Sequence, residues 1–230
     1  MSLPVVYLGI SPTSRFGVAM ANYTARLSRM WAWDAKSLKV IGFQDIKARA
    51  KLLDVSGDGE YVGYFVEALH RKQAYLAVSR PPYFHALMLR NGHYIIQSSI
   101  TFTASLLVFT RERFEDCEWL RNLDETTQRH CPLRIIEGNV DSFPDETPPP
   151  FDGSFVSSYK RRGLAYQPWE GAAPSEFGTQ WKGHDGMGRE IWSDGLHVYA
   201  DETPFLDLAR QPFTEVVPPE WAKSWIAPRK

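Results

Sequence analysis

Three consecutive prolines at positions 148–150 constrain this chain more than any other feature. Proline fixes its own φ angle and lacks a backbone N–H, so the acidic stretch DSFPDETPPPFDGS that contains them can continue neither a helix nor a central strand. The prolines therefore divide the sequence. We expect an α+β core over residues 1–140, a linker or surface loop over 141–153, and a loop-rich region over 154–230 that packs on the core.

Short apolar runs predict the strands of the core. These runs cover residues 4–10, 37–43, 74–79, 100–110 and 133–137. Two dipeptides, Asn91-Gly92 and Asp194-Gly195, lie between apolar runs. Both favour the positive φ angles that a two-residue hairpin turn needs, so a hairpin is expected at each.

Apolar residues that recur every three or four positions predict helices in the same region. One series runs from Phe16 to Met30, after a serine and a proline that are typical of a helix start. Similar spacing predicts a helix after Gly59, another after Thr110, and a short one over residues 46–53, where a strand is also possible. The sequence thus predicts an α+β fold. In it, a mixed sheet with flanking helices precedes an irregular, aromatic-rich C-terminal region.

Charge and composition argue against several classes of protein. The formal net charge of −1 supplies no field that would draw the whole chain onto nucleic acid or an anionic membrane. No apolar run approaches the roughly 20 residues that a membrane span needs, and the first residues lack the basic start of a signal peptide. The two cysteines, Cys117 and Cys131, have no metal-binding spacing. We therefore expect a soluble cytoplasmic protein without a disulfide framework.

A glycine turn rich in acidic residues, LLDVSGDGE, is a candidate ligand site. Its candidate cofactor-binding residues are Asp54, Gly57, Asp58 and Gly59. The turn resembles a calcium loop, but Phe65 occupies the position of the bidentate glutamate. It also resembles the D-x-G-x-G-x-G turn of methyltransferases, with its glycines one position out of register. We expect a structural turn in which Ser56 or Asp58 caps the following helix, and no bound cofactor.

A second stretch, SRPPYF, resembles the [DNS]-P-P-[YF] site of amino-methyltransferases. Arg80 stands where that site has an amide or an acid, and an arginine cannot accept a hydrogen bond from an amino group. The alternative function is an enzyme that acts on a nucleotide or nucleic acid. It would use methyltransferase-like chemistry at the turn of Gly57 and Gly59, or metal-assisted chemistry at the polar residues from His184 to His197.

The stretch GHDGMGREIWSDGLH gathers polar residues that could perform acid–base chemistry or bind a metal. These weak catalytic candidates are His184, Asp185, Glu190, Asp194 and His197. Both aspartates precede glycine, which is typical of turn residues. We therefore predict no metal site here.

Five of the eight tryptophans follow residue 168 and are the leading candidates for binding residues. They are Trp169, Trp181, Trp192, Trp221 and Trp225, and the last two would lie one turn apart on a short C-terminal helix. Aromatic residues fill irregular cores and also anchor interfaces, so both uses stay open. A basic patch adds Lys160, Arg161 and Arg162, beside aromatic residues that could stack on single-stranded nucleic acid. The leading hypothesis is a non-catalytic binding or accessory protein whose aromatic surface holds a protein partner or a second copy.

Overall fold

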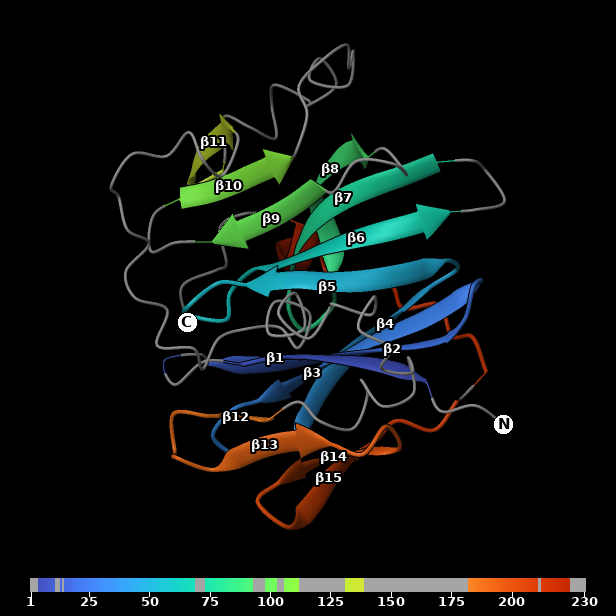
Figure 1. The fold of residues 1–230 in the computed structure, drawn as a ribbon, viewed down its shortest axis with the longest axis vertical. Coiled ribbons are helices and arrows are strands. Elements are labelled where there is room, and N and C mark those ends of the chain that lie inside the picture. The colour runs from blue at the N-terminus through green and yellow to red at the C-terminus, as the bar shows by residue number, and fades with distance from the viewer. Residues whose placement is uncertain are drawn as a thin grey trace, which may run out of the picture.

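The computed structural model describes residues 4–10, 13, 15–68, 73–92, 98–102, 106–111, 131–138, 182–210 and 212–223 (Figure 1). Within these residues the regular structure is almost entirely β-strand, and the helical part is one 3-10 turn, η5, at Glu220–Lys223. The prediction of an α+β fold with flanking helices is therefore wrong. The predicted linker at 141–153 lies outside the described residues.

The strands form four sheets. The first contains β1 (Val5–Gly9), β2 (Phe16–Thr24), β3 (Leu27–Asp34) and β4 (Val40–Ile46). The second contains β5 (Arg49–Val55), β6 (Val62–Ala68), β7 (Gln73–Arg80) and β8 (His85–Gly92). The third contains β9 (Ser98–Phe102), β10 (Leu106–Arg111) and β11 (Arg134–Gly138). The fourth contains β12 (Lys182–His184), β13 (Glu190–Ser193), β14 (His197–Ala200) and β15 (Thr203–Asp207).

Each four-stranded sheet is an antiparallel meander, and the third sheet is mixed because β11 runs parallel to β10. Figure 1 shows the sheets stacked in layers, with the fourth sheet at one end, then the first, the second and the third. Face-to-face packing of successive four-stranded meanders is also how neighbouring blades of β-propellers are arranged.

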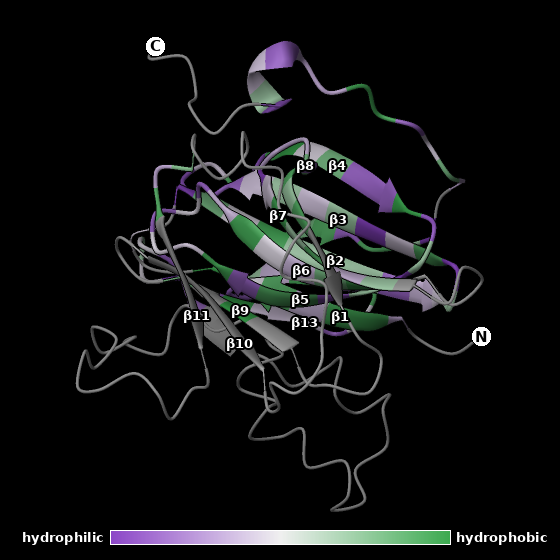
Figure 2. Cartoon of the chain, turned by 90° about the horizontal axis from the view of Figure 1, so that it is seen from above, coloured by the Kyte–Doolittle hydropathy of each residue, from purple (hydrophilic) through white to green (hydrophobic). Residues whose placement is uncertain are grey.

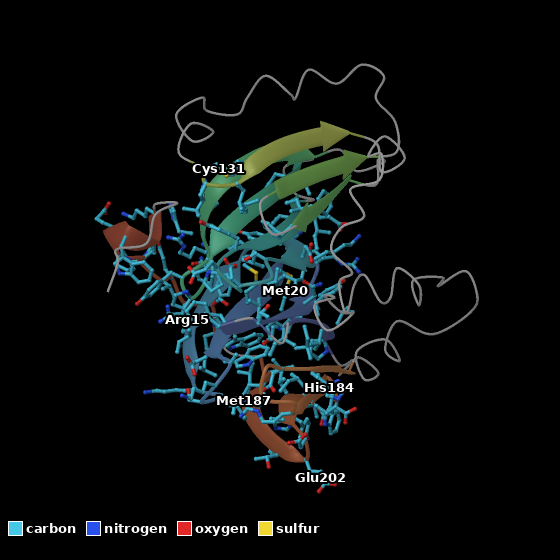
Figure 3. All side chains as sticks on the ribbon, turned by 90° about the vertical axis from the view of Figure 1, so that its left-hand side faces the viewer. Arg15, Met20, Cys131, His184, Met187 and Glu202 are labelled. Carbon is cyan, nitrogen blue, oxygen red and sulfur yellow. The ribbon has the colours of Figure 1, made fainter. Side chains whose placement is uncertain are left out.

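Both faces of the first two sheets are buried. Met20 from the first sheet packs with Leu52 of the second in one cluster, and Figure 3 shows Met20 inside the molecule. On the opposite face of the first sheet, Trp33 belongs to a cluster with Val198 of the fourth sheet. Phe102 of the third sheet covers the far face of the second. Figure 2, viewed along the stack, shows the resulting hydrophobic bands on these strands.

Burial on both faces explains why helices were predicted. Successive side chains of a strand point to opposite faces, so a strand covered on both sides is apolar at nearly every position. Such a run contains apolar residues at every spacing, including three and four. The series from Phe16 to Met30 is β2 and part of β3, residues 46–53 enter β5, and the residues after Gly59 are β6. The helix predicted after Thr110 falls largely outside the described residues, and Thr110 itself belongs to β10.

One of the two predicted hairpins is confirmed. Asp194-Gly195 lies in the connection between the antiparallel strands β13 and β14, and Gly195 has a positive φ of 91°. The expected two-residue turn is not formed, because Ser193 pairs with Val198. Asn91-Gly92 is instead the end of β8, where both residues pair with β7. The run over 100–110, expected as one strand, contributes to two antiparallel strands, β9 and β10.

The described part of the C-terminal region is not irregular, contrary to the prediction. Residues 182–207 form the fourth sheet, and a tail, described over residues 208–210 and 212–223, lies on the β4 and β8 side of the stack (Figure 2). Buried Arg29 and Asp45 tie this tail to the first sheet through Pro212 and Thr214. No helix in the described part of the chain has the length and apolar character to cross a membrane.

Candidate interaction surface

The glycine turn over residues 52–60 belongs to the hairpin between β5 and β6. Asp54 is fully buried, and its carboxylate accepts the backbone N–H of Phe102 at 2.9 Å, which joins the second sheet to the third. Asp58 accepts the N–H of Glu60 at 2.9 Å and closes the turn. The expected capping by Asp58 therefore serves a hairpin turn and not a helix. Because the glycines lead into a strand, the turn lacks the helix N-terminus that binds phosphate in nucleotide-binding folds.

The SRPPYF stretch is a tight turn between β7 and β8. Arg80 is buried, donates from Nη2 to the hydroxyl of Tyr61 at 3.0 Å, and lies 3.7 Å from a carboxylate oxygen of Glu60. Burial raises the pKa of Tyr61 above its ordinary value, against the opposing charge and hydrogen bond of Arg80. Tyr83 packs edge-on against Trp221 of the tail, with ring centroids 5.5 Å apart. The motif thus supports the packing of the tail.

The polar residues between His184 and His197 divide between the two ends of β13. His184 is exposed and pairs in register with Glu190 at one end. Asp185 is buried and binds the side chain of Arg189 at 2.7 Å. Asp194 lies at the other end. Among the described residues, no group of three or more His, Cys, Asp or Glu side chains is placed to hold a metal ion.

The outer face of the fourth sheet carries a stacked pair of aromatic rings. Trp192 on β13 and Tyr199 on β14 are cross-strand partners, and their ring centroids lie 4.2 Å apart with an interplanar angle of 10°. His197 meets Tyr199 edge-on at 6.0 Å. We call these three half-buried residues the aromatic ridge.

The ridge faces away from the stack. The neighbouring residues Ile191 and Val198 are fully buried in the cluster shared with the first sheet, so the alternate residues Trp192 and Tyr199 occupy the opposite face. No other described sheet covers that face (Figure 1). Figure 3 shows His184 and Glu202 on the same sheet, which is the lowest layer in that view.

Hydrogen bonds within the chain hold both rings in place. The indole Nε1 of Trp192 donates to the backbone carbonyl of Asp201 at 2.6 Å. The hydroxyl of Tyr199 donates to Oδ2 of Asp194 at 2.9 Å. Asp194 Oδ1 in turn accepts the N–H groups of Leu196 and His197, each at 2.7 Å. The polar atoms that orient the rings are therefore satisfied inside the protein, and the rings are preorganised.

The charge of Asp194 reinforces this arrangement. Partial burial alone would raise the pKa of its carboxyl group, but hydrogen bonds from His197, Leu196 and Tyr199 hold that pKa below its ordinary value. The hydrogen bond to Asp194 raises the pKa of Tyr199. At neutral pH the carboxylate is thus ionised and the hydroxyl keeps the proton that it donates.

Only part of the predicted binding set lies in the described chain. Trp192 is in the aromatic ridge, whereas Trp221 lies in η5, remains 37% exposed and packs on Tyr83. The expected short C-terminal helix is, in its described part, this 3-10 turn. Outside the described residues lie Trp169, Trp181, Trp225, Lys160, Arg161 and Arg162.

Sequence reasoning missed Tyr199 and Asp201. The turn predicted at Asp194-Gly195 would not have found Tyr199, because a two-residue turn there would pair Trp192 with His197. In the structure Ser193 pairs with Val198, and this longer connection shifts the register so that Trp192 lies opposite Tyr199.

Searches of protein families, curated proteins and solved structures found no match to this chain. The surface is therefore interpreted from its own geometry.

Proposed function

We propose that this protein is a non-catalytic binding or accessory protein that holds a partner protein on the outer face of β12–β15, with Trp192 and Tyr199 as anchors. The observation that carries the proposal is the stacked, internally hydrogen-bonded pair of rings on that face. Tryptophan and tyrosine are enriched among the few interface residues that dominate binding energy.

Preorganisation of the rings favours a binding role. A partner that covers Trp192 and Tyr199 gains their apolar area without having to order them first, because the stack and its two hydrogen bonds already fix their orientation. The strands beneath them are rigidly supported, since Ile191 and Val198 are fully buried against the first sheet.

The polar residues of the region support binding over catalysis. Asp185 and Asp194 are engaged by turn N–H groups, and the former also binds Arg189. Asp54 and Asp58 accept backbone N–H groups in the same way. Each of these carboxylates thus has a role in holding its own loop or sheet. The low cysteine content fits the cytoplasmic location that we propose for the protein.

The test compares the wild-type protein with Trp192→Ala/Tyr199→Ala as bait in a lysate of the source cells. Phe213→Ala is the matched control, because Phe213 is a 40% exposed aromatic residue on the tail. Proteins retained by wild type and control but lost from the double variant are then purified and titrated against all three baits. Loss of one hot-spot aromatic weakens binding by at least about 2 kcal/mol, so we expect about 30-fold or more for the pair.

Two controls accompany this experiment. Circular dichroism must show that the double variant is folded, and we expect it to be, because both side chains are only half-buried. Native mass measurement of each bait tests whether the partner is a second copy of the chain. If the double variant retains every protein that wild type binds, and the same oligomeric mass, the proposed function is wrong.

A further inference from the structure

We infer that the partner segment bound by the aromatic ridge presents arginine side chains; this inference rests on the proposed function. The region over residues 182–210 carries twice as many acidic as basic residues. Its acidic residues are Asp185, Glu190, Asp194, Asp201, Glu202 and Asp207, and its basic residues are Lys182, Arg189 and Arg210. A surface of this sign attracts cationic partners and repels phosphate.

Carboxylates stand at both ends of the stacked pair. Asp194 lies at the Tyr199 end, where its Oδ2 is 2.9 Å from the phenolic oxygen. Asp201 lies at the Trp192 end, where its backbone carbonyl accepts the indole N–H and its carboxylate accepts the N–H of Glu190. Exposed Glu202 follows it in the same turn. A ligand that covers both rings therefore meets negative charge on either side.

Two basic residues lie close to β13 in the chain. Lys182 pairs in register with Trp192, so this face includes one basic residue among its more numerous acidic residues, whereas the charge of Arg189 is neutralised. Arg189 binds the buried carboxylate of Asp185 at 2.7 Å and donates to the backbone carbonyl of Ala35 in the first sheet. Its charge is thus directed into the protein, away from the ridge.

Arginine can bind both the aromatic rings and the carboxylates of this surface. Its planar guanidinium stacks on the rings of tryptophan and tyrosine, and its forked N–H groups match carboxylates. Lysine offers a compact ammonium that matches the charge but does not stack as a plane. A nucleic acid could stack its bases on the rings, but its phosphates would be repelled. The combination of rings and carboxylates therefore favours arginine over both.

The test uses fluorescein-labelled peptides and the full-length protein, with binding followed by anisotropy in low salt. The probes are a nonapeptide of alternating arginine and leucine, its lysine and glutamate analogues, and an oligothymidylate. We expect the arginine peptide to bind about tenfold more tightly than the lysine peptide, and both to bind more tightly than the two anionic probes. Trp192→Ala/Tyr199→Ala should weaken the arginine peptide at least tenfold.

Charge variants test whether the carboxylates beside the rings contribute to binding of the arginine peptide. Asp201→Asn/Glu202→Gln should weaken the arginine peptide about fivefold and reduce its salt dependence. The Asn side chain tolerates the positive φ of 53° at position 201 and can still accept the N–H of Glu190. Glu215→Gln/Glu220→Gln, which removes two charges from the tail, is the matched control and should bind as wild type does.

Three results with the labelled probes would overturn the inference. They are equal affinity for the arginine and lysine peptides, tighter binding of an anionic probe, and no binding of the arginine peptide up to millimolar concentration. An equal effect of the two charge variants would overturn it as well. Each of these leaves the proposed function standing if the natural partner still depends on Trp192 and Tyr199. The proposed function fails separately, when the natural interactions ignore those two residues.

Discussion

Removing the carboxylate of Asp45 is the sharpest test of how the chain holds its C-terminal tail. The Asp45 side chain is 1% exposed and binds the guanidinium of Arg29, itself 2% exposed, through both oxygens, with Nη2 to Oδ2 at 2.6 Å. One of these oxygens also accepts the N–H of Thr214 at 2.7 Å. Arg29 donates in addition to the carbonyl of Pro212 at 3.0 Å. Asp45→Ala would therefore leave a buried cation without its counter-ion.

The expected loss of stability is large for this reason. Breaking one partner out of a buried ion pair costs about 3–5 kcal/mol, because the remaining charge stays desolvated. A guanidinium keeps its proton in proteins, so loss of that proton cannot relieve the buried charge of Arg29. The ring of Phe43, 4.7 Å from the guanidinium carbon, offers only partial compensation.

Urea unfolding followed by fluorescence measures the effect. With a slope of about 3 kcal/mol per molar urea, the midpoint of Asp45→Ala should fall by about 1–1.7 M. Glu67→Ala is the control, since its pair with Lys51 at 3.1 Å is partly exposed and should contribute at most about 1 kcal/mol. Arg29→Met/Asp45→Leu removes both charges and should recover most of the lost stability.

A midpoint for Asp45→Ala within about 0.2 M of wild type would refute this reasoning, because a change below about 0.6 kcal/mol is incompatible with an unpaired buried cation. A double variant as unstable as the single one would also refute it. That result would mean that the contacts to the tail, and not the buried charge, dominate.

Three other changes test the packing and the charges of the chain. Gly17→Ala would place a Cβ 2.1 Å from the ring of buried Trp33, so overpacking should lower the free energy of unfolding by about 1–3 kcal/mol in thermal unfolding. The control Gly57→Ala has open space around its Cβ and should melt as wild type does. The pKa of Asp194 is lowered in the folded protein, so its ionised carboxylate stabilises the fold fully above the ordinary pKa of 3.8, and this stabilisation is lost as the pH falls below that value. In Asp194→Asn the free energy of unfolding should therefore fall less steeply at acidic pH. An unchanged dependence of stability on acidic pH would contradict this. Trp221→Ala should lower the free energy of unfolding in urea by about 2 kcal/mol. This is less than the roughly 3–5 kcal/mol for a fully buried aromatic residue, because Trp221 is 37% exposed. An unchanged free energy of unfolding would show that the packing of the tail does not depend on Trp221.

The sequence by itself determined features that depend on a few adjacent residues. The hairpin at Asp194-Gly195 was predictable because its turn requires a positive φ, which Gly195 supplies at 91°. Strands β1, β7 and β11 were predictable because they are short apolar runs bounded by polar or small residues. The turn role of the glycines after Asp54 was also predictable, although the element that follows them was not.

Only the tertiary structure decided between helix and strand for β2 and β6. Their apolar residues fit a helical spacing because each strand is covered by a sheet on both faces, and no local signal reveals a second covering layer. The same limit applies to the charge network of the tail. Arg29 and Pro212 are separated by 183 residues, so only the stacking of the sheets makes them neighbours.

The aromatic ridge lies between these two cases. The sequence predicts Trp192 as a binding candidate, but the register that brings Tyr199 opposite it depends on the longer connection between Ser193 and Val198, which the structure alone shows. Which face of the hairpin is buried depended on the apolar residues of the first sheet, far away in the chain, that cover Ile191 and Val198. Alternation along a strand sets which side chains share a face, but the packing of one sheet on another sets which face meets solvent.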